Sequence, residues 1–322
     1  MLGFFGHRFQ ISELKSPIVH FWDTSYKTDR SKFGFYDASG HVYTKKENAS
    51  FVKLFNHKIP HLNYIHQYSD SFLLFQYEKN NADLKHTCLL DTRTKMILDF
   101  HWKNTSATEF IHDENNMYYR FDYFGNVFQY SIDTGESFYK SLEFSSYEYL
   151  MTIKKKNSLL YVLNNMNIFR IYQLHQDGDI SCVYQNKIIE RVLTKKMEIS
   201  LVDKDHTHLI FMYMNDRIDI FTYDGKFNIK SISQIKKEGN APIIDLAIQN
   251  DFLVLTTFRK VILYRYTGVF FEKIQEKVYK DLPYHSEILW KDRVLYFNNQ
   301  DHLYTIQLDT SRYNQTYSVI KI

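Results

Sequence analysis

Five carboxylates stand in similar surroundings along the chain, each a few residues ahead of a short apolar run. They are Glu109, Glu148, Glu198, Asp245 and Glu287. If folding brings them to one confined mouth, they would attract cations or a basic peptide segment, or hold a metal ion. Paired carboxylates in a channel also serve glycosidases as general acid and as base or nucleophile. Which of these applies depends on the elements that position the five residues.

Those elements repeat. An apolar run, a turn, a second apolar run and a turn bearing Asp or Gly recur at roughly 40 to 50 residues, a period typical of solenoids, propellers or arrays. The turns that mark the period are Asp91-Thr92-Arg93, Asp133-Thr134-Gly135, Asp177-Gly178-Asp179, Asp224-Gly225, Thr267-Gly268 and Asp309-Thr310-Ser311.

Each repeat divides into four short strands, which we call a to d. In the clearest repeat we expect strand a over 149–153, b over 158–163, c over 168–174 and d over 180–184. Alternation in strand c places Phe169 and Ile171 on one face and Arg170 and Tyr172 on the other. Asn, Asp and Gly between the strands supply the backbone conformations that tight turns need.

Seven such units predict an all-β fold, a single seven-bladed β-propeller of four-stranded antiparallel blades spanning 1–322. Blades packed face to face around an axis bury both faces of each sheet. The units are 17–56, 61–101, 107–144, 147–184, 197–232, 243–275 and 286–322. Strand a is innermost in a propeller, so the five acids would form one negative rim on the axial channel.

The chain resembles the WD40-repeat superfamily over roughly residues 17–322. Phe128-Gln129-Tyr130-Ser131-Ile132-Asp133-Thr134-Gly135 is similar to that family's strand c and the turn after it, and Ile220-Phe221-Thr222-Tyr223-Asp224-Gly225 is a looser copy. No repeat ends strand c in Trp-Asp, and no Gly-His precedes strand a. The resemblance implies a degenerate WD repeat propeller whose internal Asp-His-Ser/Thr-Trp network is absent or replaced.

Composition fits this architecture and narrows the function. Aromatic residues make up 17% of the chain, with Tyr and Phe at 26 each, and Gly at only 10. Aromatic richness suits half-buried strands. The net charge of +3 is too small to indicate a nucleic-acid-binding face. We find no signal peptide and no apolar run long enough to span a bilayer, and therefore expect a cytoplasmic or nuclear protein.

Two further expectations concern the ends and the thiols. Residues 1–16 are a closing or capping segment: 7–12 could pair as an extra strand, but Thr316–Ile320 already reads as a complete last strand. Both alternatives stay open. Cys88 and Cys182 lie in strand-like runs of different repeats, and we expect two buried, reduced thiols.

Other chemical motifs are weak. The fourteen histidines show no metal-ligand spacing, and no nucleotide-binding or nucleophile-elbow motif occurs. Phe258-Arg259-Lys260 is a partial echo of the Phe-Arg-Arg-Gly motif of phosphoinositide-binding propellers, without the second Arg or the Gly. Lys154-Lys155-Lys156 and other lysine pairs sit in predicted turns, where solvated lysines belong.

The sequence therefore predicts a non-catalytic scaffold for protein–protein interaction, a propeller subunit of a multi-subunit complex. Its partners would be other protein subunits, and possible ligands include a basic peptide at the acidic channel rim. We predict no enzymatic activity, cofactor or metal. The first alternative is a propeller that binds phosphoinositide or RNA, and the second is a channel-active hydrolase using the strand-a carboxylates.

Overall fold

The structure is a computed structural model of residues 1–322. It describes residues 16, 18–23, 33–45, 51–54, 58–59, 61–67, 72–78, 85–91, 97–100, 107–112, 117–131, 133–175, 177–187, 194–201, 206–224, 226, 228–237, 239, 241–249, 251–279, 287–291, 294–299, 302–308 and 319–321. All statements below refer to these residues.

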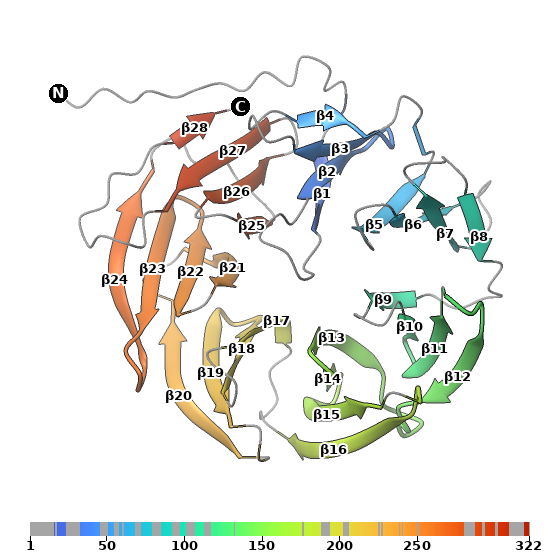
Figure 1. The fold of residues 1–322 in the computed structure, drawn as a ribbon. Helices are drawn as coiled ribbons and strands as arrows, with labels where there is room; N and C mark the ends of the chain where they lie inside the picture. Colours follow the sequence, from blue (N-terminus) through green and yellow to red (C-terminus); the bar gives the residue numbers. More distant parts are fainter. Residues whose placement is uncertain are drawn as a thin grey trace.

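The described strands form four-stranded antiparallel sheets arranged in a ring (Figure 1). In each sheet the strands follow chain order, from a next to the axis to d at the perimeter. The first four sheets are β1 (Ile18–Asp23) to β4 (Phe51–Lys53), through β2 (Phe33–Asp37) and β3 (Val42–Lys45); β5 (Leu62–Gln67), β6 (Phe72–Glu78), β7 (Lys85–Asp91), β8 (Ile97–Phe100); β9 (Ala107–His112), β10 (Met117–Asp122), β11 (Asn126–Ser131), β12 (Ser137–Ser141); and β13 (Leu150–Lys156), β14 (Leu159–Asn164), β15 (Ile168–Leu174), β16 (Ile180–Lys187).

The remaining three sheets continue the ring. They are β17 (Thr194–Leu201), β18 (Thr207–Tyr213), β19 (Arg217–Tyr223), β20 (Ile229–Lys236); β21 (Ile243–Gln249), β22 (Phe252–Thr257), β23 (Lys260–Tyr266), β24 (Phe271–Val278); and β25 (Ile288–Lys291), β26 (Val294–Asn299), β27 (His302–Gln307), β28 (Val319–Lys321). We number the blades one to seven in this order. The chain folds as a β-propeller, as predicted.

Blade four buries both of its faces, which explains why its middle strands read as nearly continuous apolar runs. In β15, Phe169 and Ile171 pack into the core shared with blade five. Tyr172 and Leu174 pack into the core shared with blade three. The alternation predicted for strand c is confirmed, and each face of the blade belongs to a different core.

The blades are joined by apolar packing, and they are not all alike. Among the described residues, six hydrophobic clusters each join two neighbouring sheets. The blades also differ in strand length, since β4 and β28 have 3 residues and β16 has 8.

The ring closes through side-chain packing between blades seven and one. β1 contacts β26, and the Phe33 and Tyr296 rings meet edge-on with centroids 4.8 Å apart. Lys45 Nζ donates a hydrogen bond to the Tyr296 hydroxyl at 2.8 Å. The last strand of blade seven is the C-terminal β28. The alternative in which 7–12 adds a strand lies outside the described residues.

Several strand limits differ from the sequence-based ones because the outer strands run further than their apolar patterns. β16 continues to Lys187, β20 to Lys236 and β24 to Val278, with exposed residues at the ends. The expectation for the thiols was half wrong: Cys88 is buried, but Cys182 is exposed on the outermost strand of blade four.

The b–c hairpins share one geometry. In blades one, three, four and five the fourth residue of the turn donates its backbone N–H to the first and has positive φ: Gly40, Gly125, Asn167 and Asp216. In three of them the first residue is Asp37, Asp122 or Asn164, and its Oδ1 accepts hydrogen bonds from the backbone N–H groups two and four positions later. This side-chain-to-backbone turn fixes the direction of these three hairpins.

Among the described residues, no helix has the length and apolar character that a membrane crossing requires.

Candidate functional site

Three of the five predicted acids come together beside the axis. Glu198 lies on β17, Asp245 on β21, and Glu287 immediately before β25. Glu148 lies immediately before β13 and has its own partners. The backbone of Glu109 pairs with Phe121 in blade three, but its side chain lies outside the described residues.

Lys196 of β17 is the centre of this group. Its Nζ contacts Asp245 Oδ1 at 2.7 Å and Glu198 Oε1 at 3.4 Å, and donates to the Leu246 carbonyl oxygen at 2.8 Å. Burial alone would lower the pKa of Lys196, but the charges of Asp245, Glu198 and Glu287 raise it above its ordinary value. The lysine therefore stays charged and compensates the acids.

The polar contacts continue from blade to blade. Lys154 Nζ of blade four lies 3.7 Å from Glu198 Oε1 of blade five, and Lys196 of blade five reaches Asp245 of blade six. Asp245 Oδ2 accepts a hydrogen bond from the backbone N–H of Ile288 in blade seven at 2.9 Å. We call Lys154, Glu198, Lys196, Asp245 and Ile288 the axial belt. Glu287 makes a similar link, accepting from the backbone N–H of Phe21 in blade one at 3.3 Å.

The contacts of the axial belt give Glu198 and Asp245 a structural role. Burial would raise the pKa of Glu198, but Lys154 and Lys196 lower it. The acceptor atoms of Asp245 are already used: Oδ1 accepts from Lys196 and from the Leu246 backbone N–H at 2.8 Å, and Oδ2 from Ile288. Recognition of a basic peptide by the five acids stays a prediction, and a peptide would have to compete with the two lysines.

The contacts of Asp245 are those of a structural residue and differ from those of a catalytic carboxylate. Within the described part of the chain, no three His, Cys, Asp or Glu side chains gather closely enough to hold a metal ion. A hydrolytic carboxylate must exchange a proton or attack a substrate. Asp245 instead accepts hydrogen bonds from Lys196 of blade five and from the backbone N–H of Ile288 in blade seven, and so links these blades to blade six.

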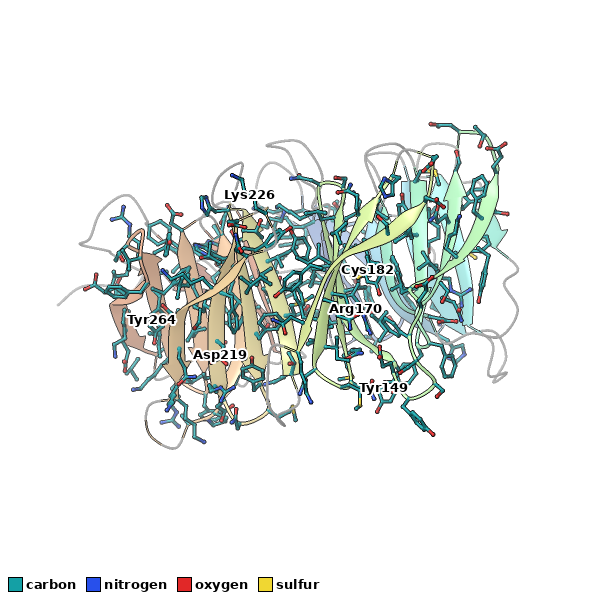
Figure 2. All side chains as sticks on the ribbon, turned by 90° about the horizontal axis from the view of Figure 1, so that it is seen from below. Tyr149, Arg170, Cys182, Asp219, Lys226 and Tyr264 are labelled. Atoms are coloured by element: carbon teal, nitrogen blue, oxygen red, sulfur yellow. The ribbon has the colours of Figure 1, made fainter. Side chains whose placement is uncertain are left out.

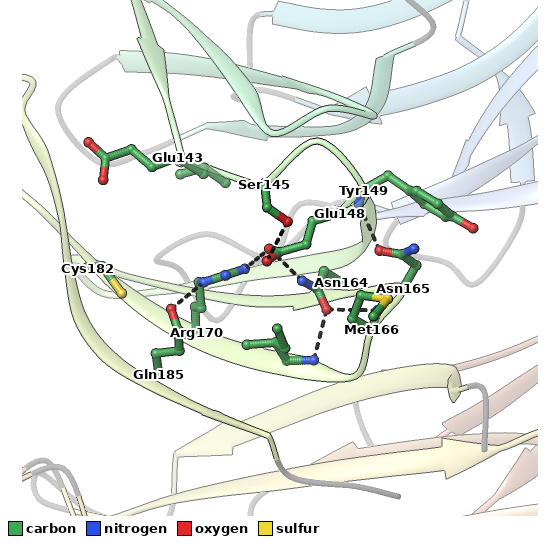
Figure 3. Close-up of polar contacts among 12 residues, drawn as sticks. Glu143, Ser145, Glu148, Tyr149, Asn164, Asn165, Met166, Arg170, Cys182 and Gln185 are labelled. Carbon is green, nitrogen blue, oxygen red and sulfur yellow. Dashed lines mark hydrogen bonds and ion pairs between the residues drawn. The ribbon is translucent and has the colours of Figure 1, made fainter. Parts of the chain in front are cut away.

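Glu148 forms a second, buried group in blade four (Figure 3). Its Oε2 accepts from Arg170 Nη1 at 2.6 Å and from Asn164 Nδ2 at 2.8 Å, and Oε1 accepts from Ser145 Oγ at 3.1 Å. Arg170 Nε donates to Gln185 Oε1 at 2.8 Å. Burial works to raise the pKa of Glu148, but the bonds from Arg170, Ser145 and Asn164 hold it below the ordinary range.

This buried pair anchors the connection that leads from blade three into blade four. Asn165 adds two bonds: its Oδ1 accepts from the Tyr149 backbone N–H at 2.8 Å, and its Nδ2 donates to the Tyr147 carbonyl oxygen at 3.1 Å. The Tyr149 ring stacks on Tyr123 with centroids 4.5 Å apart. The connection thus holds Tyr147, whose side chain is exposed, in a defined position.

A set of large apolar side chains on one face was not predicted from the sequence. The b–c hairpins and the d–a connections lie on the same face of the ring, which we call the hairpin face. Figure 2 shows the ring edge-on, with Tyr149 of a d–a connection at the lower margin and Lys226 of a c–d turn at the upper margin. The b–c hairpins of four successive blades each expose at least one such residue, and we call the most exposed one of each the hairpin tip: Phe124 (67% exposed), Met166 (49%), Met214 (65%) and Phe258 (43%).

Exposed cations lie beside the hairpin tips. Lys187 and Lys236 end outer strands on the hairpin face, Lys237 follows, and Arg259 is next to Phe258. The Arg259 guanidinium lies 5.6 Å from the Phe258 ring centroid. Phe258-Arg259-Lys260 therefore forms the blade-six hairpin, where Lys260 is held by Glu276 of β24. A turn signature, Asp or Asn followed three positions later by Gly, Asn or Asp, could have located two of the tips.

The sequence matches no protein-family model and no curated protein. Solved structures resemble the whole ring. Hsv2 of Kluyveromyces lactis gives a TM-score of 0.65 at 12% identity, covering 96% of this chain and 98% of that one. Hsv2 of Kluyveromyces marxianus gives 0.63 at 10%, covering 95% and 97%. The computationally designed protein Ika8 gives 0.57 at 9%, covering 96% and 97%. These likenesses establish the fold.

Proposed function

We propose that this propeller is a non-catalytic interaction module that binds a partner protein on its hairpin face. One observation carries the proposal: four successive blades present a large apolar side chain at the same place on the same face. Scattered single apolar residues are normal on a protein surface, but here one recurs at the b–c hairpin of each of four successive blades. Phe, Tyr, Met and Arg are also the residue types enriched in protein interfaces.

The hairpin tips suit this role because their backbones are already fixed. The Asx bonds of Asp122 and Asn164 and the buried Glu148–Arg170 pair order the loops before any partner arrives. Little conformational entropy is then lost on binding, so more of the buried apolar area contributes to affinity. Methionine at two tips adds a side chain that adapts to the shape of the partner.

The test is affinity capture from the native organism with quantitative mass spectrometry. The variant Phe124→Ser/Met214→Ser/Phe258→Ser should lose stoichiometric partners, with recovery reduced at least about tenfold. The matched control is Val269→Ser/Phe270→Ser, which removes two exposed apolar residues from a c–d turn on the opposite face. It should retain the partners. Equal recovery with both variants would contradict the proposal.

A phosphoinositide or RNA ligand stays a second candidate because Phe258 and Arg259 are both exposed at one tip. Binding of that kind would weaken steeply with salt. Sedimentation with vesicles, with and without phosphoinositide, at low and physiological salt would measure it. Binding lost in Arg259→Ala and absent without the lipid would favour this candidate. We propose no enzymatic role for the chain.

A further inference from the structure

A small cavity opens on the hairpin face between blades five and six. Its walls are apolar and belong to the core that the two blades share, including Ile243, Leu255 and Ile262. Three lysines also line it: Lys236 and Lys237 from the end of blade five, and Lys260 from the start of β23. The cavity lies between the hairpins that carry Met214 and Phe258, so it forms part of the proposed interaction face.

One buried polar group in the cavity lacks a partner. Thr257 ends β22, lines the cavity and is 6% exposed. Its Oγ1 makes no hydrogen bond to any described residue. Leaving a buried hydroxyl without a hydrogen-bond partner costs roughly 1–3 kcal/mol of stability, so such groups usually bind a ligand or water. A ligand atom that accepts hydrogen bonds could bond to Thr257 Oγ1 in this cavity.

The charges around the cavity favour an anion. Lys237 Nζ lies 3.3 Å from Asp216 Oδ2, and Lys260 is paired with Glu276. These two acids compensate two of the three lysines, and Lys236 has no carboxylate partner within the described residues. The apolar walls require that the anion be carried next to hydrophobic atoms. A hydrated inorganic ion would not satisfy them.

We propose that this cavity receives an acidic side chain of the partner protein, flanked by a bulky apolar residue. The carboxylate contacts Lys236 and accepts a hydrogen bond from Thr257 Oγ1 at the mouth of the cavity, and the apolar neighbour stays outside it and packs on the exposed tips Met214 and Phe258. This inference rests on the proposed function and narrows it: the partner presents an acidic–apolar segment to the junction of blades five and six.

The probe is a phage-displayed library of random 12-residue peptides, panned on the full chain. Recovered peptides are synthesised with a fluorescent label and measured by anisotropy. We expect them to share Asp or Glu next to Leu, Ile, Phe or Met. Thr257→Val should weaken binding about threefold to tenfold, because it removes only the hydroxyl. Lys236→Glu should weaken it about tenfold or more, through repulsion of the peptide carboxylate.

Two controls separate binding from folding. Lys230→Glu reverses a charge at the other end of the same strand β20, on the opposite face, and should leave the affinity unchanged. Thr257→Val should not destabilise the free protein, because the hydroxyl it removes makes no bond there. Weak binding caused by unfolding would lower the melting temperature of that variant as well, and that result would overturn the assignment.

Three further outcomes contradict the inference. Peptides without an acidic residue, affinities equal to wild type in Thr257→Val and Lys236→Glu, or vesicles with anionic lipid that bind through these residues while no peptide does, would each overturn it. Its failure is distinguishable from failure of the proposed function. If the hairpin-tip variant loses its partners while the cavity variants keep them, the proposed function is supported and the acidic–apolar segment is contradicted.

Discussion

At the scale of single residues, blade four keeps an arginine in its interior because a carboxylate meets it there. Arg170 is buried, the Glu148 side chain is only 9% exposed, and Ser145, Asn164 and Gln185 make further hydrogen bonds to the pair. A buried ion pair of this kind adds little net stability compared with apolar residues, but breaking it leaves one charge alone in the interior. The pair is therefore a sensitive reporter of this region.

We predict that Glu148→Gln destabilises the protein by about 3–5 kcal/mol at neutral pH. The folded pKa of Glu148 lies below its ordinary value of 4.5. The stability it contributes is therefore complete above that value and is lost as pH falls through the lower, folded pKa. The difference between the melting temperatures of wild type and variant should therefore shrink as pH falls below 4.5 and through the folded pKa. A constant difference across that range would contradict the assignment.

Gly40 is required by its surroundings as well as by its φ of 86°. A Cβ there would stand 1.9 Å from the Ile59 carbonyl oxygen, whereas one on Gly135, with φ of 72°, would meet nothing within 4 Å. Gly135→Ala should cost roughly 1–2 kcal/mol for the conformation alone. Gly40→Ala should cost about 1–3 kcal/mol more, since backbone must move. Urea unfolding compares the two, and equal losses would show that Ile59 yields freely.

At the scale of elements, the b–c hairpins of successive blades share the same turn geometry. Asp122 in blade three and Asn164 in blade four fill the same place and make the same two bonds to backbone N–H groups. The repeat extends to the outer strands. The third residue of strand c bonds a glutamine of strand d in blades four and five, Arg170 with Gln185 and Asp219 with Gln234.

We predict that Asp122→Asn costs less than Asp122→Ala, because Asn164 shows that an amide oxygen serves the turn, and only the bond from Asn126 Nδ2 to Asp122 Oδ2 is lost. Asp122→Ala should cost roughly 1–3 kcal/mol, since it leaves the Phe124 and Asn126 N–H groups without their acceptor. Chemical denaturation measures both variants. A loss in Asp122→Asn as large as that in Asp122→Ala would mean that the charge, and not the turn geometry, matters.

At the scale of the whole molecule, the blades are held by apolar cores between sheets and by the axial belt near the centre. The cores supply most of the stability, because they remove large apolar areas from water. The axial belt supplies directional contacts between strands that have no backbone pairing with each other. It also supplies a counter-ion to Glu198 and Asp245, two of the carboxylates at strand-a positions.

We predict that Lys196→Met destabilises the ring by roughly 1.5–3 kcal/mol, because Asp245 and Glu198 lose their shared charged donor. The 27% exposure of the lysine side chain keeps this below the cost of a fully buried charge. Lys154→Met should cost less than about 1 kcal/mol, since its contact is longer and more exposed. Thermal unfolding at low and high salt tests the ranking. Equal losses in the two variants would remove Lys196 from the centre of the belt.

The sequence by itself determined the propeller, the repeat, the strand order and most of the middle strands. These depend on local signals: apolar alternation, turn residues and a period that neighbouring units must share. It also located Glu198, Asp245 and Glu287 near the axis, since each precedes or lies within a strand a.

Only the tertiary structure decided what those acids meet. Lys154 and Lys196 look like solvated lysines in the sequence, and the blade-to-blade distances that make them counter-ions arise from ring closure. The hairpin tips were missed for a related reason: Phe124 and Met214 adjoin apolar strands and read as core, until the turn geometry directs them outward. Contacts between blades depend on the packing of whole sheets, and no local pattern in the sequence records them.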